Sequence, residues 1–573
     1  MIEIEVNNRK VKAEAGEMIL SALERAGVKV PTLCHMKDLV PSGACRICSV
    51  EVEGYKNLVP SCSYPVLEGM KIKTNSPRAI RARKTIIELL LANHLQDCLY
   101  CVRNGDCELQ TLAIQYGVRE KRYLADRCEH FLDMSSPAIV RDQNRCILCG
   151  KCVRVCEEIM GVSAIDFINR GSKTVIAPAF NQSMNVSSCI NCGQCVMVCP
   201  TGALREKSSL KEVTDALHDP DKFVIVQHAP ALSVTLAEEF GMKPGADIDK
   251  KIVNAFRRLG FNRVFDTSYS ADLTIMEEAS ELVSRIQSNG VLPMMTSCSP
   301  GWIKYVEQFY PEFIPNISTC KSPQQMLGAL IKNYYAQNEG LDPAKVFSVA
   351  IMPCTAKKFE AKRPEMSWNN IADIDAVLTT RELARLIKMY GIEFDSLVPN
   401  EPDMPFGKRS SAGKLFGGTG GVMEAAIRTA HYLITNREMD DLVVKEVRGL
   451  KGIKEMKITI DGMVLGVAVA SGIMNAQKIL EEIKAGRNDL HFIEVMTCPG
   501  GCIAGGGQPF NTDQKKITAR MQALYSIDQN EITRASHLNK AVADLYKDFL
   551  EKPLSERSHQ LLHTHYSERE VMV

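Results

Sequence analysis

Two cysteine runs decide the fold of the first part of this chain: residues 146–156 read CILCGKCVRVC, and residues 189–200 read CINCGQCVMVCP. Both runs space their cysteines by two, two and three residues. Paired runs of this kind bind two [4Fe–4S] clusters, and the fourth cysteine of each run ligates the other cluster. Zinc sites also use cysteine, but this spacing favours iron and sulfur. The expected ligand sets are Cys146, Cys149, Cys152 and Cys199 for one cluster, and Cys189, Cys192, Cys195 and Cys156 for the other.

The composition is that of a globular protein whose cysteines bind metal. The 573 residues include 69 lysines and arginines against 68 aspartates and glutamates, a balance that argues against a nucleic-acid partner. The length predicts about three or four domains. No apolar run reaches the roughly 20 residues of a membrane span, and residues 2–6 look like a strand rather than a signal peptide, so we expect a cytoplasmic protein. Thiols stay reduced there, so the 21 cysteines, sixteen of them between residues 34 and 199, are expected to hold metal.

A third group of cysteines lies inside a small α+β unit. The unit begins with the alternating pattern of residues 2–6 and continues with apolar residues at helical spacing from Ile19 to Ala26, which Gly27 closes. A two-residue gap in this group lets one turn supply two thiolates to one iron, and four thiolates suit a [2Fe–2S] cluster. A structural zinc site is the alternative. The four ligands are Cys34, Cys45, Cys48 and Cys62.

A fourth group follows an apolar helical stretch at residues 86–91 and consists of His94, Cys98, Cys101 and Cys107. One imidazole with three thiolates holds either zinc or a [4Fe–4S] cluster. The position of this group between other cluster segments favours the cluster. Its neutral imidazole removes negative charge from the site, which should change the reduction potential. Four clusters in series indicate an electron path, and such a path needs a terminus.

From about residue 210 the sequence alternates apolar strands with helices, as in an α/β domain. We expect strands at 223–227, 346–352 and 492–496, and helices at 271–286 and 324–335. In such sheets, chemistry gathers in the loops just beyond the carboxyl ends of the strands.

The remaining cysteines lie in such loops, within TSCSPGW at 296–302, MPCTAKK at 352–358 and MTCPGGC at 496–502. Glycine-rich loops let the backbone approach a bulky ligand closely. Converging thiolates in these loops therefore indicate a second, deeply placed metal cluster.

These three loops resemble the signature motifs of the iron-only hydrogenases, and together with the cluster segments the resemblance covers nearly the whole chain. Within this family, the chain resembles both the monomeric clostridial-type enzymes and the catalytic subunits of NAD(P)-linked multimeric hydrogenases. It implies an α+β multidomain protein, with ferredoxin-type iron–sulfur domains followed by a large α/β catalytic domain. The implied boundaries are a plant-type-like [2Fe–2S] ferredoxin domain at 1–77, a [4Fe–4S] domain with one histidine and three cysteine ligands at 78–136, a two-[4Fe–4S] ferredoxin-like domain at 137–209, and the catalytic domain with a small-subunit-like tail at 210–573.

The resemblance also implies the cofactors: one [2Fe–2S] cluster, three accessory [4Fe–4S] clusters, and the H-cluster. In this family the H-cluster is a [4Fe–4S] cubane that shares one cysteine with a diiron subsite carrying CO, cyanide and a bridging dithiolate. By motif, Cys502 would be the shared ligand, while Cys354 and Cys498 would bind the cubane. The family surrounds the diiron subsite with further groups, which correspond here to Lys357, Pro230, Gln324, Met352 and Met496.

One position departs from the family pattern. The usual first motif has two adjacent cysteines, the first relaying protons and the second ligating the cubane, whereas this chain has Cys298 followed by Ser299. Either Ser299 binds iron through oxygen, or Cys298 becomes the fourth ligand and a hydroxyl or water relays protons, or the cluster is incomplete. Because the surrounding residues align without a gap, we favour Cys298 beside the diiron subsite.

A proton route is expected from the same resemblance. Glu278, Glu281 and Arg285 share one helix face by their spacing and, with Ser318, match the relay of the family. The alternative is a solvated helix face of no catalytic importance. The reaction implied is the reversible formation of H2 from two protons and two electrons.

The expected electron partners are ferredoxin and/or a flavin-containing subunit that oxidises NAD(P)H, because Gly417–Gly421 lacks the context of a dinucleotide site. Hydrogenase maturation proteins are the other expected partners. His559, His563 and His565 could bind metal, but we expect an exposed polar tail there. Cys128 and Cys320 have no expected role.

Two other functions would use part of this pattern. An electron-transfer subunit like the large peripheral subunit of respiratory complex I would explain the amino-terminal clusters but not the three later loops. A hydrogenase-like iron–sulfur assembly or sensory protein would keep the cubane without a diiron subsite, and Ser299 fits that alternative.

Overall fold

The computed structural model describes residues 1–37, 39–125 and 130–571, and these form two compact units. The chain passes between the units within the eight-cysteine segment, so neither unit is a continuous stretch of sequence. The first unit comprises Met1–Glu158, Ser163–Ser187 and Val198–Arg205, and the second comprises Ile159–Val162, Ser188–Met197 and Glu206–Val573.

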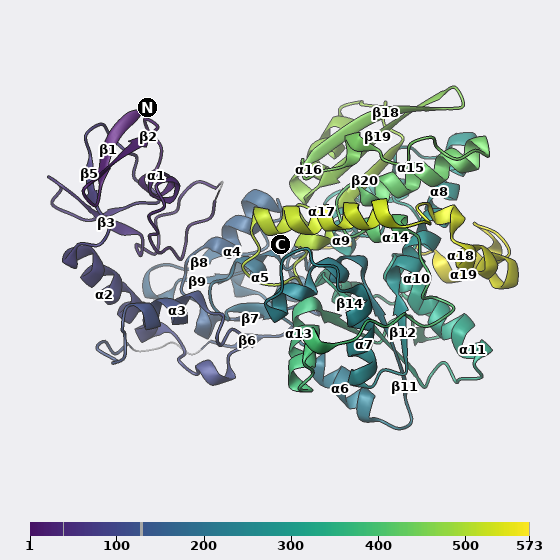
Figure 1. The fold of residues 1–573 in the computed structure, drawn as a ribbon, viewed down its shortest axis with the longest axis horizontal. Coiled ribbons are helices and arrows are strands. Elements are labelled where there is room, and N and C mark those ends of the chain that lie inside the picture. Colours follow the sequence, from purple (N-terminus) through teal and green to yellow (C-terminus); the bar gives the residue numbers. More distant parts are fainter. Residues whose placement is uncertain (38, 126–129, 572–573) are drawn as a thin grey trace. The chain divides into compact units, whose positions relative to one another are not determined.

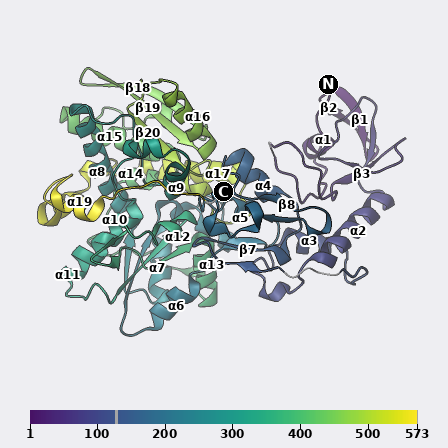
Figure 2. The same cartoon turned by 180° about the vertical axis from the view of Figure 1, so that it is seen from behind.

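A five-stranded sheet in the order β2-β1-β5-β3-β4 opens the first unit (Figures 1 and 2). The buried face of α1 (Ile19–Arg25) and the inward side chains of the strands form its apolar core. The strand predicted at residues 2–6 and the helix predicted from Ile19 are therefore confirmed. The strands are β1 (Ile2–Val6), β2 (Arg9–Ala13), β3 (Ser49–Val52), β4 (Val59–Pro60) and β5 (Lys71–Lys73).

The rest of the first unit consists of helices and short strands that carry the other cluster segments. α2 starts after Ser76, whose hydroxyl caps the helix by accepting the N–H of Ala79. The apolar stretch predicted at 86–91 lies within this helix. The elements are α2 (Pro77–Asn93), α3 (Glu108–Gln115), β6 (Leu132–Asp133), β7 (Ile139–Asp142), α4 (Lys151–Arg154), β8 (Asp166–Ile168), β9 (Val175–Ala177) and β10 (Leu204–Glu206).

The second unit is built on two sheets with helices around them, which agrees with the predicted α/β domain. One sheet is parallel throughout, in the order β12-β11-β14-β17, and its strands are buried apolar runs. Its strands are β11 (Phe223–His228), β12 (Arg263–Asp266), β14 (Val346–Met352) and β17 (Ala376–Thr379). The other has the order β13-β20-β19-β18, with β18 (Ile453–Ile460), β19 (Met463–Ser471), β13 (Met294–Met295) and β20 (Phe492–Met496).

The long helix α8 (Thr267–Gln287) is the central helix of the second unit. Most of its residues are buried, because it contacts α10 (Pro323–Leu330), α14 (Ser411–Leu415) and α15 (Gly421–Thr435). The helix predicted at 271–286 lies within α8. The helix predicted at 324–335 is α10 followed by a π-helical turn, η10 (Ile331–Tyr335).

Several of the remaining helices pack on the two sheets, and others pack on helices. α17, drawn in yellow in Figure 1, contacts α14, while α19 contacts α10. They are α5 (Gln194–Val198), α6 (Leu210–His218), α7 (Asp249–Leu259), α9 (Pro300–Phe309), α11 (Ala336–Asn338), α12 (Ala356–Glu360), α13 (Thr380–Met389), α16 (Ile473–Lys484), α17 (Gln514–Asn530), α18 (Lys540–Leu545) and α19 (Glu556–Leu562).

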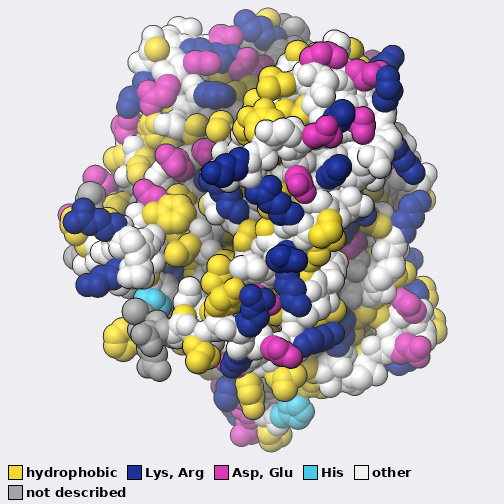
Figure 3. Space-filling model, turned by 90° about the vertical axis from the view of Figure 1, so that its left-hand side faces the viewer, with side chains coloured by type: hydrophobic (Ala, Val, Ile, Leu, Met, Phe, Trp, Pro, Cys, Tyr) yellow, Lys and Arg dark blue, Asp and Glu magenta, His cyan; other side chains and the backbone are white. Residues whose placement is uncertain are grey.

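Two surface properties bear on partners. No helix among the described residues has the length and apolar character needed to cross a bilayer. On the face shown in Figure 3, lysine and arginine side chains gather near the centre among acidic and hydrophobic ones.

Candidate functional site

A largely apolar cavity lies in the second unit where loops from the two sheets meet. Pro230 follows β11, Cys354 follows β14 and Cys498 follows β20, so each loop begins at the carboxyl end of a parallel strand. This is the edge of an α/β sheet where chemistry is expected. The predicted residues that line this single cavity are Cys298, Ser299, Cys354, Cys498, Cys502, Lys357, Pro230, Gln324, Met352 and Met496.

The donor set of this cavity fits an iron cluster. Burial raises the pKa of the thiols of Cys354, Cys498 and Cys502, in the last case to about 12, and negative charge at Cys354 raises the pKa of the other two further. Such thiols would ionise only beside positive charge, which coordinated iron supplies. Three converging sulfurs in an apolar cavity therefore favour a cluster over a structural role for free thiols.

Glycines let the loops pack tightly around these sulfurs. Gly501 has a φ of +87°, and a Cβ there would lie 2.6 Å from the backbone nitrogen of Thr419. A Cβ on Gly505 would lie 2.2 Å from the carbonyl oxygen of Pro353. Neither position has space for a side chain, so Gly501 lets the Cys502 loop approach Thr419 closely, and Gly505 lets it approach the loop that carries Cys354.

Both members of the unusual Cys298–Ser299 pair reach the cavity. The Ser299 hydroxyl lies 2.7 Å from the hydroxyl of Thr497 and accepts the backbone N–H of Thr497 at 3.2 Å. Burial and the neighbouring Glu278 raise the pKa of the Cys298 thiol well above its usual value. The thiol therefore holds its proton in this environment, whereas an exposed thiol has a pKa of roughly 8.5.

A buried carboxylate outside the set predicted from the sequence organises the polar side of the cavity. Glu360 accepts Lys357 Nζ at 2.9 Å, Gln324 Nε2 at 3.1 Å and the Ser322 hydroxyl at 2.9 Å. Lys357 also donates to the carbonyl of Cys298 at 3.1 Å. Because Glu360 is three residues after Lys357 on a helix, the spacing could have identified the pair.

The predicted relay residues lie close together between α8 and the loop before α10. Ser318 Oγ donates to Glu281 Oε2 at 2.7 Å, and Arg285 Nη2 donates to Glu281 Oε1 at 2.6 Å. Glu278 and Glu281 are both buried, so the alternative of a solvated helix face is wrong for them.

Glu278 has the most perturbed carboxyl of this group. Burial, followed by the charge of Glu281, raises the pKa of Glu278 to about 8. Its oxygens form no well-oriented hydrogen bond with a described residue, although the Ser297 N–H and the Ser318 hydroxyl are near enough to lower its pKa in part. A carboxyl with a pKa near 8 can both release and accept a proton at neutral pH.

Part of the second predicted ferredoxin-type site borders the cavity. Burial raises the pKa of the Cys192 thiol, and the charges of Cys195, Cys498 and Cys189 raise it further. Cys192 also lines the cavity itself. These segments are packed together, because Thr355 Oγ1 donates to the carbonyl of Asn191 at 2.7 Å. Cys156, predicted as the fourth ligand of this centre, lies in the first unit, where its sulfur accepts the N–H of Ala164 at 3.3 Å.

In the first unit, the structure brings the other predicted set together. Cys146, Cys149, Cys152 and Cys199 line one small cavity, so the last cysteine of the second run lies with the first three of the first run. Burial raises the pKa of Cys146 to about 11 and that of Cys149 to about 12. This arrangement fits the exchange of fourth ligands that the spacing predicts.

The first amino-terminal ligand group is a local cluster, and the second is distributed over the segment from the end of α2 to the start of α3. The four cysteines after α1 adjoin one another: contacts with the Cys45 and Cys62 thiols lower the pKa of Cys34, and the Cys62 thiol lowers that of Cys48. In the other group, His94 ends α2 and Cys107 precedes α3. Cys98 is the first residue of the short helical turn between them, and Cys101 follows that turn.

One expectation about the carboxy-terminal tail is wrong. His559 and His565 are exposed, but His563 is buried, with Nδ1 2.8 Å from Thr319 Oγ1 and Nε2 3.1 Å from Glu277 Oε2. The tail packs on the loop before α10 through long-range contacts that a local sequence pattern does not reveal. Cys128 lies outside the described residues.

Comparison with known families divides the chain in the same way. Residues 222–506 match the iron only hydrogenase large subunit, C-terminal domain, and residues 514–569 match the iron hydrogenase small subunit. The other matches are a 2Fe-2S iron-sulfur cluster binding domain at 1–77, the NADH-ubiquinone oxidoreductase-G iron-sulfur binding region at 83–122, and the ferredoxin-like domain of NADH-quinone oxidoreductase subunit 3 at 136–205.

Two relatives match over nearly the full chain, and a solved structure matches part of it. The NADP-reducing hydrogenase subunit HndD of Solidesulfovibrio fructosivorans is 45% identical, over 100% of this chain and 99% of the relative. Iron hydrogenase 1 of Clostridium pasteurianum is 42% identical, over 99% of this chain and 100% of the relative. The structure of apo [FeFe]-hydrogenase HydA1 from Chlamydomonas reinhardtii matches with a TM-score of 0.58 and 42% identity, over 63% of this chain and 99% of that one.

These matches do not favour the two non-catalytic alternatives, because the relatives that align from end to end are hydrogenases. Iron–sulfur domains precede a domain whose cavity gathers the motif cysteines, in the order that this family uses. The chain belongs to the iron-only hydrogenase family.

Proposed function

We propose that this chain reversibly converts two protons and two electrons into H2 at the cavity of the second unit. One observation carries the proposal. Cys192, a predicted ligand of an accessory cluster, lines the same cavity as Cys354, Cys498 and Cys502. Electrons from an accessory centre would therefore arrive beside the reaction site.

Each iron–sulfur cluster would have its own set of ligand residues. Cys34, Cys45, Cys48 and Cys62 would hold the [2Fe–2S] cluster, and His94 with three cysteines a [4Fe–4S] cluster. The eight-cysteine segment would hold two more, within the four-domain division expected from the sequence. Cys354, Cys498 and Cys502, with Ser299, would hold the H-cluster, which when bound supplies the redox-active iron at which hydrogen is made or split.

The chain's own residues would then move the proton. The Cys298 thiol holds its proton at the cavity wall because burial disfavours the thiolate. Glu278 would exchange that proton and pass it through Ser318 to Glu281, whose carboxylate accepts the Ser318 hydroxyl. Arg285 fixes Glu281 at the outer end by donating to it and to the carbonyl of Ile317.

Lys357 and Gln324 would orient the polar ligands of the diiron subsite. Both donate to Glu360, which holds their side chains in place at the cavity wall. Pro230, Met352 and Met496 supply an apolar wall around the same space. Excluding water there strengthens each remaining polar contact.

Ferredoxin and/or a flavin-containing, NAD(P)H-oxidising subunit would supply the electrons. The full-length similarity to an NADP-reducing hydrogenase subunit supports the second donor. The lysine and arginine group of Figure 3 would suit a partner with an acidic docking face. Hydrogenase maturation proteins would install the diiron subsite, and we expect the protein to act in the cytoplasm.

Infrared spectroscopy tests this function. The protein is produced anaerobically with the maturation enzymes, and hydrogen evolution from reduced methyl viologen is measured on the same sample. We expect bands of iron-bound CO and cyanide together with hydrogen evolution. If a sample fully loaded with iron showed neither these infrared bands nor hydrogen evolution, the chain would be an electron carrier.

A further inference from the structure

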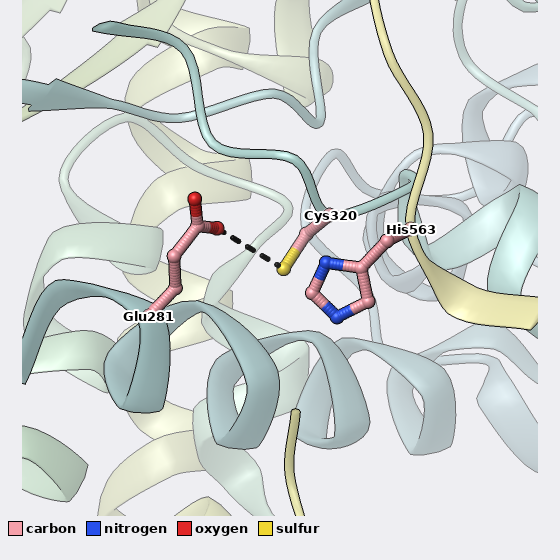
Figure 4. Close-up of side chains that lie close together, drawn as sticks. All are labelled: Glu281, Cys320 and His563. Atoms are coloured by element: carbon pink, nitrogen blue, oxygen red, sulfur yellow. Dashed lines mark hydrogen bonds between the residues drawn. The ribbon is translucent and has the colours of Figure 1, made fainter. Parts of the chain in front are cut away.

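A buried cluster of three metal-binding residue types lies beside the relay, and neither Cys320 nor His563 has a role in the proposed reaction. Glu281 comes from α8, Cys320 from the loop before α10, and His563 from the residue after α19. One ligand atom from each lies within 4.8 Å of the others, and all three residues are buried. Figure 4 shows the Cys320 thiol between the Glu281 carboxylate and the His563 ring.

The surroundings orient the imidazole as they do in metal sites. His563 Nε2 lies 3.1 Å from Glu277 Oε2, and Glu277 is itself held by the Tyr546 hydroxyl at 2.6 Å and the Leu554 N–H at 2.8 Å. A histidine that binds metal through one nitrogen usually donates its other N–H to such a carboxylate. The remaining nitrogen, Nδ1, is on the side of Thr319, whose hydroxyl lies 2.8 Å away.

We propose that Glu281, Cys320 and His563 form a mononuclear site for a soft divalent cation, with zinc as the best fit. One sulfur, one imidazole nitrogen and one carboxylate oxygen are all common zinc ligands, and a fourth tetrahedral position would remain for water or the Thr319 hydroxyl. Mg²⁺ and Ca²⁺ prefer oxygen ligands throughout. Zinc binding is not a redox step: the Cys320 thiol loses its proton to solvent, and the thiolate binds the cation.

The balance of charges around the three ligands supports a cation at this site. The Glu281 carboxylate is paired with Arg285 at 2.6 Å, and Glu277 adds a second buried carboxylate behind the ring. The two positive charges of zinc and the one on Arg285 would balance the two glutamates and the Cys320 thiolate. The attraction between these balanced charges would offset part of the cost of removing them from water.

Zinc bound in this position would also block proton transfer through the relay. This consequence, unlike the binding site, rests on the proposed function. Glu281 accepts the Ser318 hydroxyl at 2.7 Å, and Cys320 Sγ lies 3.8 Å from the same carboxylate oxygen. A cation bound to that carboxylate would take it out of proton transfer, so the site links metal concentration to catalysis.

Metal analysis of the holoenzyme tests the binding site. The matured protein is incubated anaerobically with ZnCl2 and desalted, and zinc and iron are counted before zinc-edge X-ray absorption. We expect about one zinc per chain with a single sulfur at about 2.3 Å and lighter donors at about 2.0–2.2 Å. Cys320→Ala and Cys320→Ser should lose the sulfur and the retained zinc, and Glu277→Gln should weaken binding by about 10–100-fold.

His559→Gln is the matched control, because this exposed histidine lies 4.4 Å from the His563 ring, centroid to centroid, without belonging to the cluster. It should bind zinc as the unsubstituted protein does. Unchanged zinc in Cys320→Ala, or zinc bound by three or four sulfurs with loss of iron, would overturn the site.

Hydrogen evolution tests the link to the relay. ZnCl2 should slow the unsubstituted enzyme by at least about tenfold and leave Cys320→Ala at its zinc-free rate, since general acid–base groups contribute about 10²–10⁴-fold. Zinc bound with one sulfur but without slowing would overturn the link. If the protein bound zinc in this way but made no hydrogen in any form, the proposed function would fail while the site would stand.

Discussion

The hydroxyl of Ser299 lies 2.7 Å from the hydroxyl of Thr497, the residue immediately before Cys498. Ser299 is therefore tied to the loop that carries a predicted cubane ligand, and Thr497 holds its oxygen at the cavity wall. This contact holds an oxygen donor at the wall of the cavity that Cys298 also lines.

We expect Ser299→Cys to retain the cubane and to raise its reduction potential. An alkoxide is a harder donor than a thiolate and stabilises the more oxidised iron, so replacing it should make reduction easier. Electron paramagnetic resonance during a redox titration measures the potential. An unchanged potential in Ser299→Cys, combined with loss of the cubane in Cys298→Ala, would make Cys298 the fourth ligand.

Hydrogen evolution should fall as the pH rises through about 8. Burial and the charge of Glu281 raise the pKa of Glu278 to that value, so below it the carboxyl is protonated and can donate, and above it the carboxyl loses its proton. Glu278→Gln cannot exchange protons and should evolve hydrogen about 10²–10⁴-fold more slowly.

The measurement is the rate with reduced methyl viologen as a function of pH. Glu482→Gln, at an exposed glutamate that pairs with Arg487, is the control and should keep the profile. A profile with the same inflection in both Glu278→Gln and the unsubstituted enzyme would assign the inflection to another group.

Buried strands are the feature that the sequence predicts best. Strands β14 and β20 match the predicted residues because a strand buried on both faces is an unbroken apolar run. Pro230, Cys354 and Cys498 each come two residues after the end of a parallel strand, so their convergence follows from topology.

The hairpin of β18 and β19 was missed although its turn has a recognisable signal. Asp461 and Gly462 both have positive φ, and Asp-Gly between alternating apolar residues is typical of a two-residue hairpin turn. Unlike this hairpin, the burial of His563 has no local sequence signal. It depends on contacts with Thr319 and Glu277, which lie more than 240 residues earlier. No local pattern predicts such a contact.

Replacing His94 with cysteine should lower the reduction potential of one accessory centre. Thiolate adds negative charge where imidazole is neutral, and this stabilises the oxidised cluster. Redox titration followed by electron paramagnetic resonance should show one shifted [4Fe–4S] signal and unchanged signals from the other centres. A sample that contains zinc at this position and lacks that signal would show a structural metal site.

The buried ion cluster around Asp528 should be essential for the stability of the second unit. Burial alone would raise its pKa, but hydrogen bonds and charge from Arg428 lower the pKa of Asp528. Arg448 and Arg534 also donate to this carboxylate, which links α17 to α15. Asp528→Asn would leave Glu424 as the remaining carboxylate partner of Arg428 and Arg448 and lower the free energy of unfolding by about 3–5 kcal/mol.

Resistance to proteolysis in increasing urea measures this effect. The matched control is Asp489→Asn, because Asp489 pairs with Arg487 at the surface, and exposed pairs contribute about 0–1 kcal/mol. Equal losses of stability in the two variants would contradict the importance of burial.

Glu360→Gln should reduce the occupancy of the diiron subsite without removing the cubane. The amide would keep the size of the side chain but lose the charge that holds Lys357 at 2.9 Å, and Gln324 donates to the same oxygen. Substitutions that disturb the orientation of metal-site groups typically cost about 10–100-fold in metal affinity or activity. The infrared bands of CO and cyanide, scaled to the cubane signal, measure this occupancy.

The matched control is Glu312→Gln, at an exposed glutamate paired with Lys484, and this variant should keep infrared bands of full intensity. Full bands in Glu360→Gln as well would show that Lys357 reaches its position without this carboxylate.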